Sequence, residues 1–138
     1  MRTPAAQTPA DGPGDRRRRG LDTMRQVNAA GGQRMLDELD EVAPDLGRFL
    51  LEFVFGDIYS RTRLPMRERQ LVRLAALAAI GVDLEPMKAN VDSALNVGVA
   101  PEDVIEVFVQ CLPYIGFPRV LAAVRQAKEV FDDRSGSG

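Results

Sequence analysis

Apolar residues recur at steps of three and four along most of the chain, and this spacing constrains the fold more than any other feature. Such spacing places apolar side chains on one face of an α-helix. No segment alternates apolar and polar residues between hairpin turns, as a half-buried strand would. The sequence therefore predicts an all-α protein of six to seven helices.

Proline, glycine and aspartate divide these stretches into separate helices. Proline is favoured in the first turn of a helix, glycine just beyond the last turn, and aspartate as an N-cap. The first two predicted helices cover 21–28, ended by Gly31 and Gly32, and 33–42. A third helix starts at Pro44, a fourth runs from Pro65 to Gly81, and a fifth runs from Asp83 to Gly98. The last two helices start at Pro101 and Pro118. The third carries an apolar stripe and should be largely buried: Leu46, Phe49, Leu50, Phe53 and Val54.

The length of 138 residues suits one compact domain and is too short for two ordinary ones. We expect a single helical domain over 19–132. Residues 1–18 begin with a segment rich in proline, alanine and glycine and end in the first three of the four arginines at 16–19, and 133–138 are mostly small and polar, so both ends should be disordered tails. The arginine run lacks an aromatic platform or groove-reading motif, and we expect a solvated helix start or tail rather than a nucleic-acid contact.

Composition excludes several classes of function. The formal net charge of −2 gives the protein no broad attraction to nucleic acid or to membrane lipid. No stretch reaches the ~18 uninterrupted apolar residues of a membrane span, and the start lacks an apolar signal region, so we expect a cytoplasmic protein. Cys111 is the single cysteine and there is no histidine, which removes the usual zinc ligands. We expect no metal and no cofactor.

Four segments in order resemble the carboxymuconolactone decarboxylase family, which includes the alkylhydroperoxidase D-like proteins. They are EVAPDLGRFLLEFVFGDIYSR at 41–61, RERQLVRLAALAAIG at 67–81, SALNVGVAPEDVIEVFVQ at 93–110 and GFPRVLAAVRQAKEVF at 116–131. The resemblance implies a helical protomer that assembles as a homo-trimer or homo-hexamer, with a pocket near a subunit boundary. It also implies a decarboxylase branch that acts on a carboxylated lactone without metal or cofactor. The redox branch carries a Cys-x-x-Cys motif where this chain has VDLEP, so dithiol peroxide chemistry is excluded.

The residues that the resemblance makes functional are replaced here by amides. Gln70 stands where members usually have a glutamate for proton transfer, Asn90 where they have a histidine, and Asp92 where a second histidine is frequent. Helical spacing places Gln70 and Asn90 on buried stripes. Because a buried amide without a hydrogen bond costs about 1–3 kcal/mol, they form either a structural polar pair or part of a pocket in which they donate hydrogen bonds to an enolate-like oxyanion.

Other polar residues are candidates for proton transfer or substrate binding. Without histidine, a proton must move through a carboxylate, tyrosine, thiol, lysine or bound water. Asp92 and Glu106 are the carboxylate candidates, each with a solvated surface charge as the alternative. Asp57, Tyr59 and Arg61 are candidates for binding an anionic substrate group; the alternative is a helix end held by ordinary hydrogen bonds. Cys111 is a further substrate-binding candidate, with a small core residue as the alternative. Tyr114 would cap the cavity, or it would simply pack against its neighbours.

Together these features predict a diverged, cofactor-free enzyme that acts on a small oxygenated molecule, lactone-, enol- or polyketide-like. Cyclisation and isomerisation demand less of a strong base than decarboxylation, and all three remain open. The N-terminal tail, rich in alanine, proline and arginine, fits a bacterial protein of a specialised-metabolite or aromatic pathway. The alternative is a pseudoenzyme of the same fold that binds a ligand or acts as a scaffold without turnover.

Overall fold

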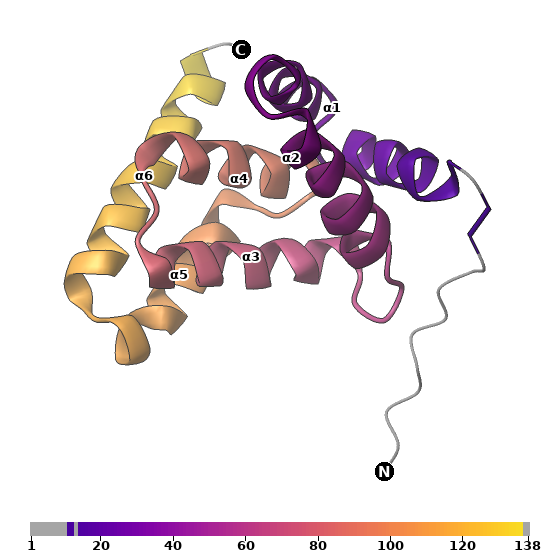
Figure 1. The fold of residues 1–138 in the computed structure, drawn as a ribbon. Helices are drawn as coiled ribbons and strands as arrows, with labels where there is room; N and C mark the ends of the chain where they lie inside the picture. The colour runs from indigo at the N-terminus through magenta and orange to yellow at the C-terminus, as the bar shows by residue number, and fades with distance from the viewer. Residues whose placement is uncertain (1–10, 13, 137–138) are drawn as a thin grey trace. The chain divides into compact units, whose positions relative to one another are not determined.

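A computed structural model describes residues 11, 12 and 14–136 (Figure 1). Helices account for the regular structure of these residues, and no strand occurs among them, which confirms the all-α prediction. In chain order the helices are α1 (Asp15–Val42), α2 (Pro44–Phe49), the π-helical segment η1 (Leu50–Tyr59), α3 (Met66–Ile80), α4 (Leu84–Asn96), α5 (Pro101–Ile115) and α6 (Phe117–Gly136). None of these helices combines the length and apolar character needed to cross a bilayer.

The chain divides into two compact units, Met1–Pro65 and Met66–Gly138. The single domain over 19–132 therefore stays a prediction. The helices also enter the segments assigned to the tails, since α1 begins at Asp15 and α6 continues to Gly136. Residues 1–10, 13, 137 and 138 lie outside the described part of the chain.

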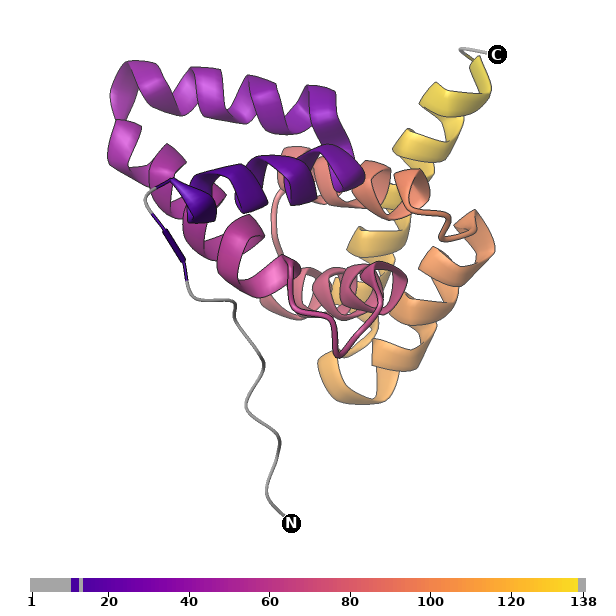
Figure 2. The same ribbon diagram turned by 90° about the vertical axis from the view of Figure 1, so that its right-hand side faces the viewer.

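In the first unit, α1 bends sharply at Asn28, whose backbone leaves the helical region at φ −163° and ψ 86°. The side-chain Oδ1 of Asn28 accepts a hydrogen bond from the backbone N–H of Gly31 at 2.9 Å, which caps the second segment. Figure 2 shows the two segments of α1 running in nearly opposite directions. The two predicted helices at the N-terminus are thus present, but the break precedes Gly31 and Gly32.

The first segment of α1 packs closely against η1. A Cβ atom on Gly20 would lie 2.1 Å from the backbone oxygen of Leu51, and one on Gly56 would lie 2.8 Å from that of Arg16. Real Cβ atoms do not approach that closely, so both glycines are required for this contact. Met24 and Phe55 are buried in the same unit.

The expectation of a largely buried third helix was wrong for its aromatic face. Leu46, Phe49 and Phe53 are 55%, 52% and 54% exposed, while Leu51 and Phe55 are buried instead. From Leu50 onward the helix is π-helical, with i→i+5 hydrogen bonds, so it turns by a different angle per residue than the α-helix assumed from the spacing.

The second unit consists of α3 to α6 around one apolar core. In Figure 1, α4 runs back alongside α3 after the turn at 81–83, and α5 and α6 pack against both. The stripes predicted for these helices form the core, whose buried members are Leu74, Ala78, Met87, Val91, Ala94, Val99, Val104, Phe108, Val120, Ala123, Ala127 and Val130. Gly81 and Gly98 end α3 and α4 with positive φ values of 74° and 94°, as expected of glycine beyond a helix end.

Candidate functional site

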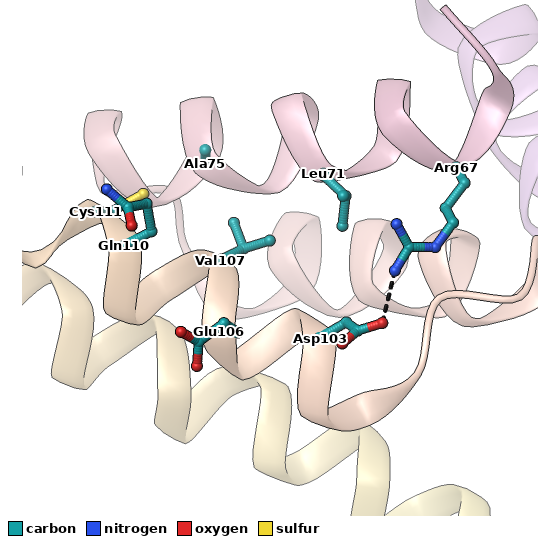
Figure 3. A pocket seen from close by; sticks show the side chains of 8 residues that line it. All are labelled: Arg67, Leu71, Ala75, Asp103, Glu106, Val107, Gln110 and Cys111. Atoms are coloured by element: carbon teal, nitrogen blue, oxygen red, sulfur yellow. Dashed lines mark hydrogen bonds and ion pairs between the residues drawn. The ribbon is translucent and has the colours of Figure 1, made fainter.

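A groove between α3 and α5 is the first candidate site in the second unit (Figure 3). Each helix contributes lining residues spaced four apart, and side chains at this spacing lie on one side of a helix. The groove holds about 380 Å³ and is lined by Arg67, Leu71, Ala75, Asp103, Glu106, Val107, Gln110 and Cys111. Its size is that of a small-molecule pocket.

The polar groups of the groove lie along its rim. Arg67 donates a hydrogen bond from Nη2 to Asp103 Oδ2 at 2.6 Å, and both side chains are close to half exposed. This ion pair closes one end of the groove, as Figure 3 shows. Glu106 has no ion-pair partner among the described residues, so its carboxylate is available to a ligand in the groove. Of the predicted site residues, the groove brings together Glu106 and Cys111.

Cys111 lines the groove and is partly buried. Burial raises the pKa of its thiol above the usual value. Since the thiolate is the nucleophilic form of cysteine, the surroundings of Cys111 suppress nucleophilic chemistry. Its position fits a wall residue of the groove.

The two amides are the second set of candidate site residues, and each is buried in the second unit. Gln70 is 0% exposed and Asn90 is 8% exposed, so both side chains are buried as the stripes predict. Asn90 donates from Nδ2 to the backbone oxygen of Pro86 at 2.6 Å, and Gln70 donates from Nε2 to the sulfur of Met66 at 3.6 Å. The other atom of each amide, Gln70 Oε1 and Asn90 Oδ1, has no hydrogen-bond partner among the described residues.

The helix pairing places the two amides about one helical turn apart in height. Gln70 lies ten residues before the end of α3, and Asn90 lies six residues after the start of α4. In two helices that run back alongside one another, this difference of four residues corresponds to about 6 Å of helix rise. Neither amide lines the α3–α5 groove or the second cavity described below.

The second cavity, also about 380 Å³, lies beside the turn between α3 and α4. Arg119 donates to the backbone oxygen of Ala79 at 2.9 Å, and Gln126 donates to that of Val82 at 3.1 Å. These bonds satisfy carbonyl groups at the end of α3 and in the turn, and they give the cavity's polar residues a structural role.

The remaining predicted residues of the second unit lie on its surface. Asp92 accepts a hydrogen bond from Arg134 Nε at 2.9 Å, and Arg134 also donates to Asn96, which ties α4 to α6. Tyr114 is 80% exposed and lines neither cavity. Proton transfer by Asp92 and capping by Tyr114 stay predictions.

The first unit holds the other three predicted residues. Asp57 accepts hydrogen bonds from Arg16 Nη2 at 2.7 Å and from Arg19 Nη2 at 3.3 Å. Arg16, and then Arg19, hold the pKa of Asp57 below its usual value, while partial burial opposes them. The Tyr59 ring packs against Phe55 with centroids 5.3 Å apart, and Arg61 is exposed. These contacts resemble the alternative raised for Asp57, Tyr59 and Arg61, which was a helix end held by ordinary hydrogen bonds.

The sequence analysis missed Arg67 and treated the arginine run, which includes Arg16 and Arg19, as a solvated helix start or tail. Arg67 stands four residues before Leu71 on the same side of α3, but its partner Asp103 is known only from the fold. Within the described part of the chain, no three Cys, Asp or Glu side chains gather as a metal ion would require.

Comparison with known proteins decides the family. The sequence model of the carboxymuconolactone decarboxylase family matches residues 44–129. This chain belongs to the carboxymuconolactone decarboxylase family. A 4-carboxymuconolactone decarboxylase from Acinetobacter baylyi is 34% identical over 100 residues, which cover 72% of this chain and 74% of that relative. The family match runs from α2 into α6 and includes both amides and the whole α3–α5 groove.

Proposed function

We propose that this family member is a cofactor-free lyase, isomerase or cyclase that acts on a small oxygenated molecule of lactone-, enol- or polyketide-like structure, in a specialised-metabolite or aromatic pathway. One observation carries the proposal: Gln70 and Asn90 are buried, and each keeps a side-chain oxygen that finds no hydrogen-bond partner among the residues that the structure describes. An unpaired buried oxygen costs about 1–3 kcal/mol, and a bound substrate would offset that cost. The similarity to a decarboxylase adds support.

In this proposal the amides orient the substrate and move no proton, because a carboxamide does not titrate near neutrality. Preorganised hydrogen bonds of this kind act through positioning and through stabilisation of developing charge. Proton transfer then falls to a carboxylate or to bound water. Bound water suits that role better than either candidate carboxylate, since Asp92 is paired with Arg134 and Glu106 lines the α3–α5 groove, which neither amide borders.

The test separates turnover from binding. Candidate substrates are 4-carboxymuconolactone, neutral enol-lactones and metabolites that mass spectrometry finds carried through purification. Gln70→Ala and Asn90→Ala should each abolish product formation in an enzyme, since each removes a positioning group. Ser93→Ala is the matched control: Ser93 is also buried on α4, but its hydroxyl donates to the backbone oxygen of Ala89.

The competing proposal is a pseudoenzyme that binds a ligand without converting it. In that case Gln70→Ala and Asn90→Ala would alter ligand affinity or thermal stability, and no variant or wild-type protein would release product. Unchanged turnover in both amide variants would overturn the proposed site.

We also propose that the chain forms a homo-oligomer, a trimer or a hexamer, in line with the family resemblance. An apolar surface on the first unit supports this assembly, and we name it the α2–η1 stripe: Leu46, Phe49 and Phe53. A phenylalanine side chain presents ~200 Å² of surface, so the two half-exposed rings leave about 200 Å² uncovered. An area of this size suits the centre of an interface that buries ~800 Å² per partner.

A further inference from the structure

The charged groups that line the α3–α5 groove do not cancel. Arg67 is the one cation among the lining residues, and Asp103 and Glu106 are the two carboxylates. Arg67 Nη2 lies 2.6 Å from Asp103 Oδ2, so these two charges neutralise each other at one end of the groove (Figure 3). Glu106 stands three residues further along α5, about 4.5 Å of helix rise. The groove therefore keeps one net negative charge, and this charge lies at Glu106.

Other lining residues suit the apolar part of a ligand. Leu71 and Ala75 of α3 and Val107 of α5 have hydrocarbon side chains, and Leu71 and Val107 lie between the two helices in Figure 3. Cys111 adds a surface of the same kind, because burial raises the pKa of its thiol and keeps it uncharged near neutral pH. An apolar ligand body would rest on these four side chains.

An ammonium group is complementary to the negative edge of the groove. It carries a positive charge and three N–H donors, and the carboxylate of Glu106 is an acceptor. Gln110 lies four residues after Glu106 on α5 and also lines the groove, so the two side chains share one side of the helix. An amine at this edge would donate to both, whereas a carboxylate ligand would meet Glu106 as a like charge.

The second cavity has the opposite charge and the same volume of about 380 Å³. Its lining includes Arg119 and no carboxylate. Size therefore does not distinguish the two sites for a small amine, while charge favours the groove.

We propose that the α3–α5 groove is a separate ligand site for a small monocationic amine with an aromatic or branched aliphatic body, whose ammonium group pairs with Glu106. This inference goes beyond the proposed function, since neither Gln70 nor Asn90 lines the groove. Glu106 is its specificity-determining residue.

The experiment compares three probes of similar size by NMR titration of the full-length chain at pH 7: the cation 2-phenylethylamine, the uncharged 2-phenylethanol and the anion phenylacetate. The amine should bind about 2–5-fold more tightly than the alcohol, the ratio expected from a partly exposed ion pair. Added salt should reduce this ratio. In Glu106→Gln the preference for the amine should disappear, whereas it should persist in Glu102→Gln, which changes an exposed glutamate of α5 outside the groove.

Cys111 reports where the amine binds. It is the single cysteine of the chain and lines the groove, so the amine should slow its alkylation by iodoacetamide. Equal binding of the amine and the alcohol, tighter binding of phenylacetate, no binding of the amine, or an unchanged alkylation rate would each overturn the inference. An undiminished amine preference in Glu106→Gln would do the same. None of these results bears on the proposed function, which depends on turnover in Gln70→Ala and Asn90→Ala.

Discussion

At the scale of single residues, two arginines of the run at 16–19 hold α1 and η1 together. Arg16 and Arg19, three residues apart on α1, both donate to Asp57 of η1, and Arg19 also donates to the backbone oxygen of Gly56. Arg17 and Arg18 are exposed. Two of the four arginines thus connect helices, and the carboxylate proposed to help hold a substrate already has two cationic partners.

Asp57→Asn should reduce the dependence of stability on acid pH. The pKa of Asp57 lies below its usual value of 3.8, so this carboxylate stabilises the folded state above that value and loses its contribution as the pH falls through the lowered pKa. Urea unfolding between about pH 2.5 and pH 6 should show a smaller loss of midpoint in Asp57→Asn than in wild type. Asp22→Asn, which removes an exposed carboxylate of α1, is the control. Parallel curves for wild type and Asp57→Asn would contradict the expectation.

At the scale of elements, the contact between α1 and η1 depends on backbone proximity. Gly20 and Gly56 let the two helices approach until main-chain atoms nearly touch, a distance at which Arg16 and Arg19 can reach Asp57. Glycine at a helix crossing has no side chain to keep the two backbones apart. The ion pairs and the close approach therefore belong to one structural feature.

Gly20→Ala should destabilise the first unit by about 1–3 kcal/mol, because the added methyl group would overlap the backbone of Leu51. Hydrogen exchange measured by mass spectrometry on peptides from 15–59 should show faster exchange in this variant. Gly47→Ala is a matched control, since its new Cβ would meet Leu39 at an ordinary 3.6 Å and alanine favours a helix. Equal protection in Gly20→Ala and wild type would refute the crossing contact.

At the scale of the whole molecule, the two units differ in what they leave exposed. The second unit buries its predicted stripes in one core, while the first exposes the α2–η1 stripe. Exposed apolar patches of this kind often mark protein–protein contacts. A second copy of the chain is the occupant we propose.

A double variant, Phe49→Ser with Phe53→Ser, should shift the protein toward monomers, because it removes most of the apolar area of the stripe. Size-exclusion chromatography with light scattering would measure the mass of each species. Val72→Ser provides the control, since Val72 is an exposed apolar residue of α3 outside the stripe. An unchanged oligomer, or a wild-type monomer, would overturn the proposed interface.

Sequence predicted the second unit better than the first for physical reasons. Pro101, Gly81 and Gly98 mark helix ends through local conformational preferences, which act without knowledge of the fold. The exposed face of η1 could not be foreseen, because the spacing rule assumes the α-helical angle per residue.

For the site, burial of Gln70 and Asn90 followed from their position on apolar stripes. The hydrogen-bond partners did not follow, since they depend on side-chain orientation. Arg67 and Asp103 are 36 residues apart and meet only through the packing of α3 on α5.

The carboxamides at positions 70 and 90 also bear on how the protein responds to acidity. A glutamate and a histidine in these places would pass through several protonation states between acid and neutral conditions. Gln70 and Asn90 keep a single state throughout, so their hydrogen-bond donors and acceptors are the same at acid and at neutral pH. If the proposed site is correct, its carboxamides would bind a substrate in the same way across this pH range, without transferring a proton themselves.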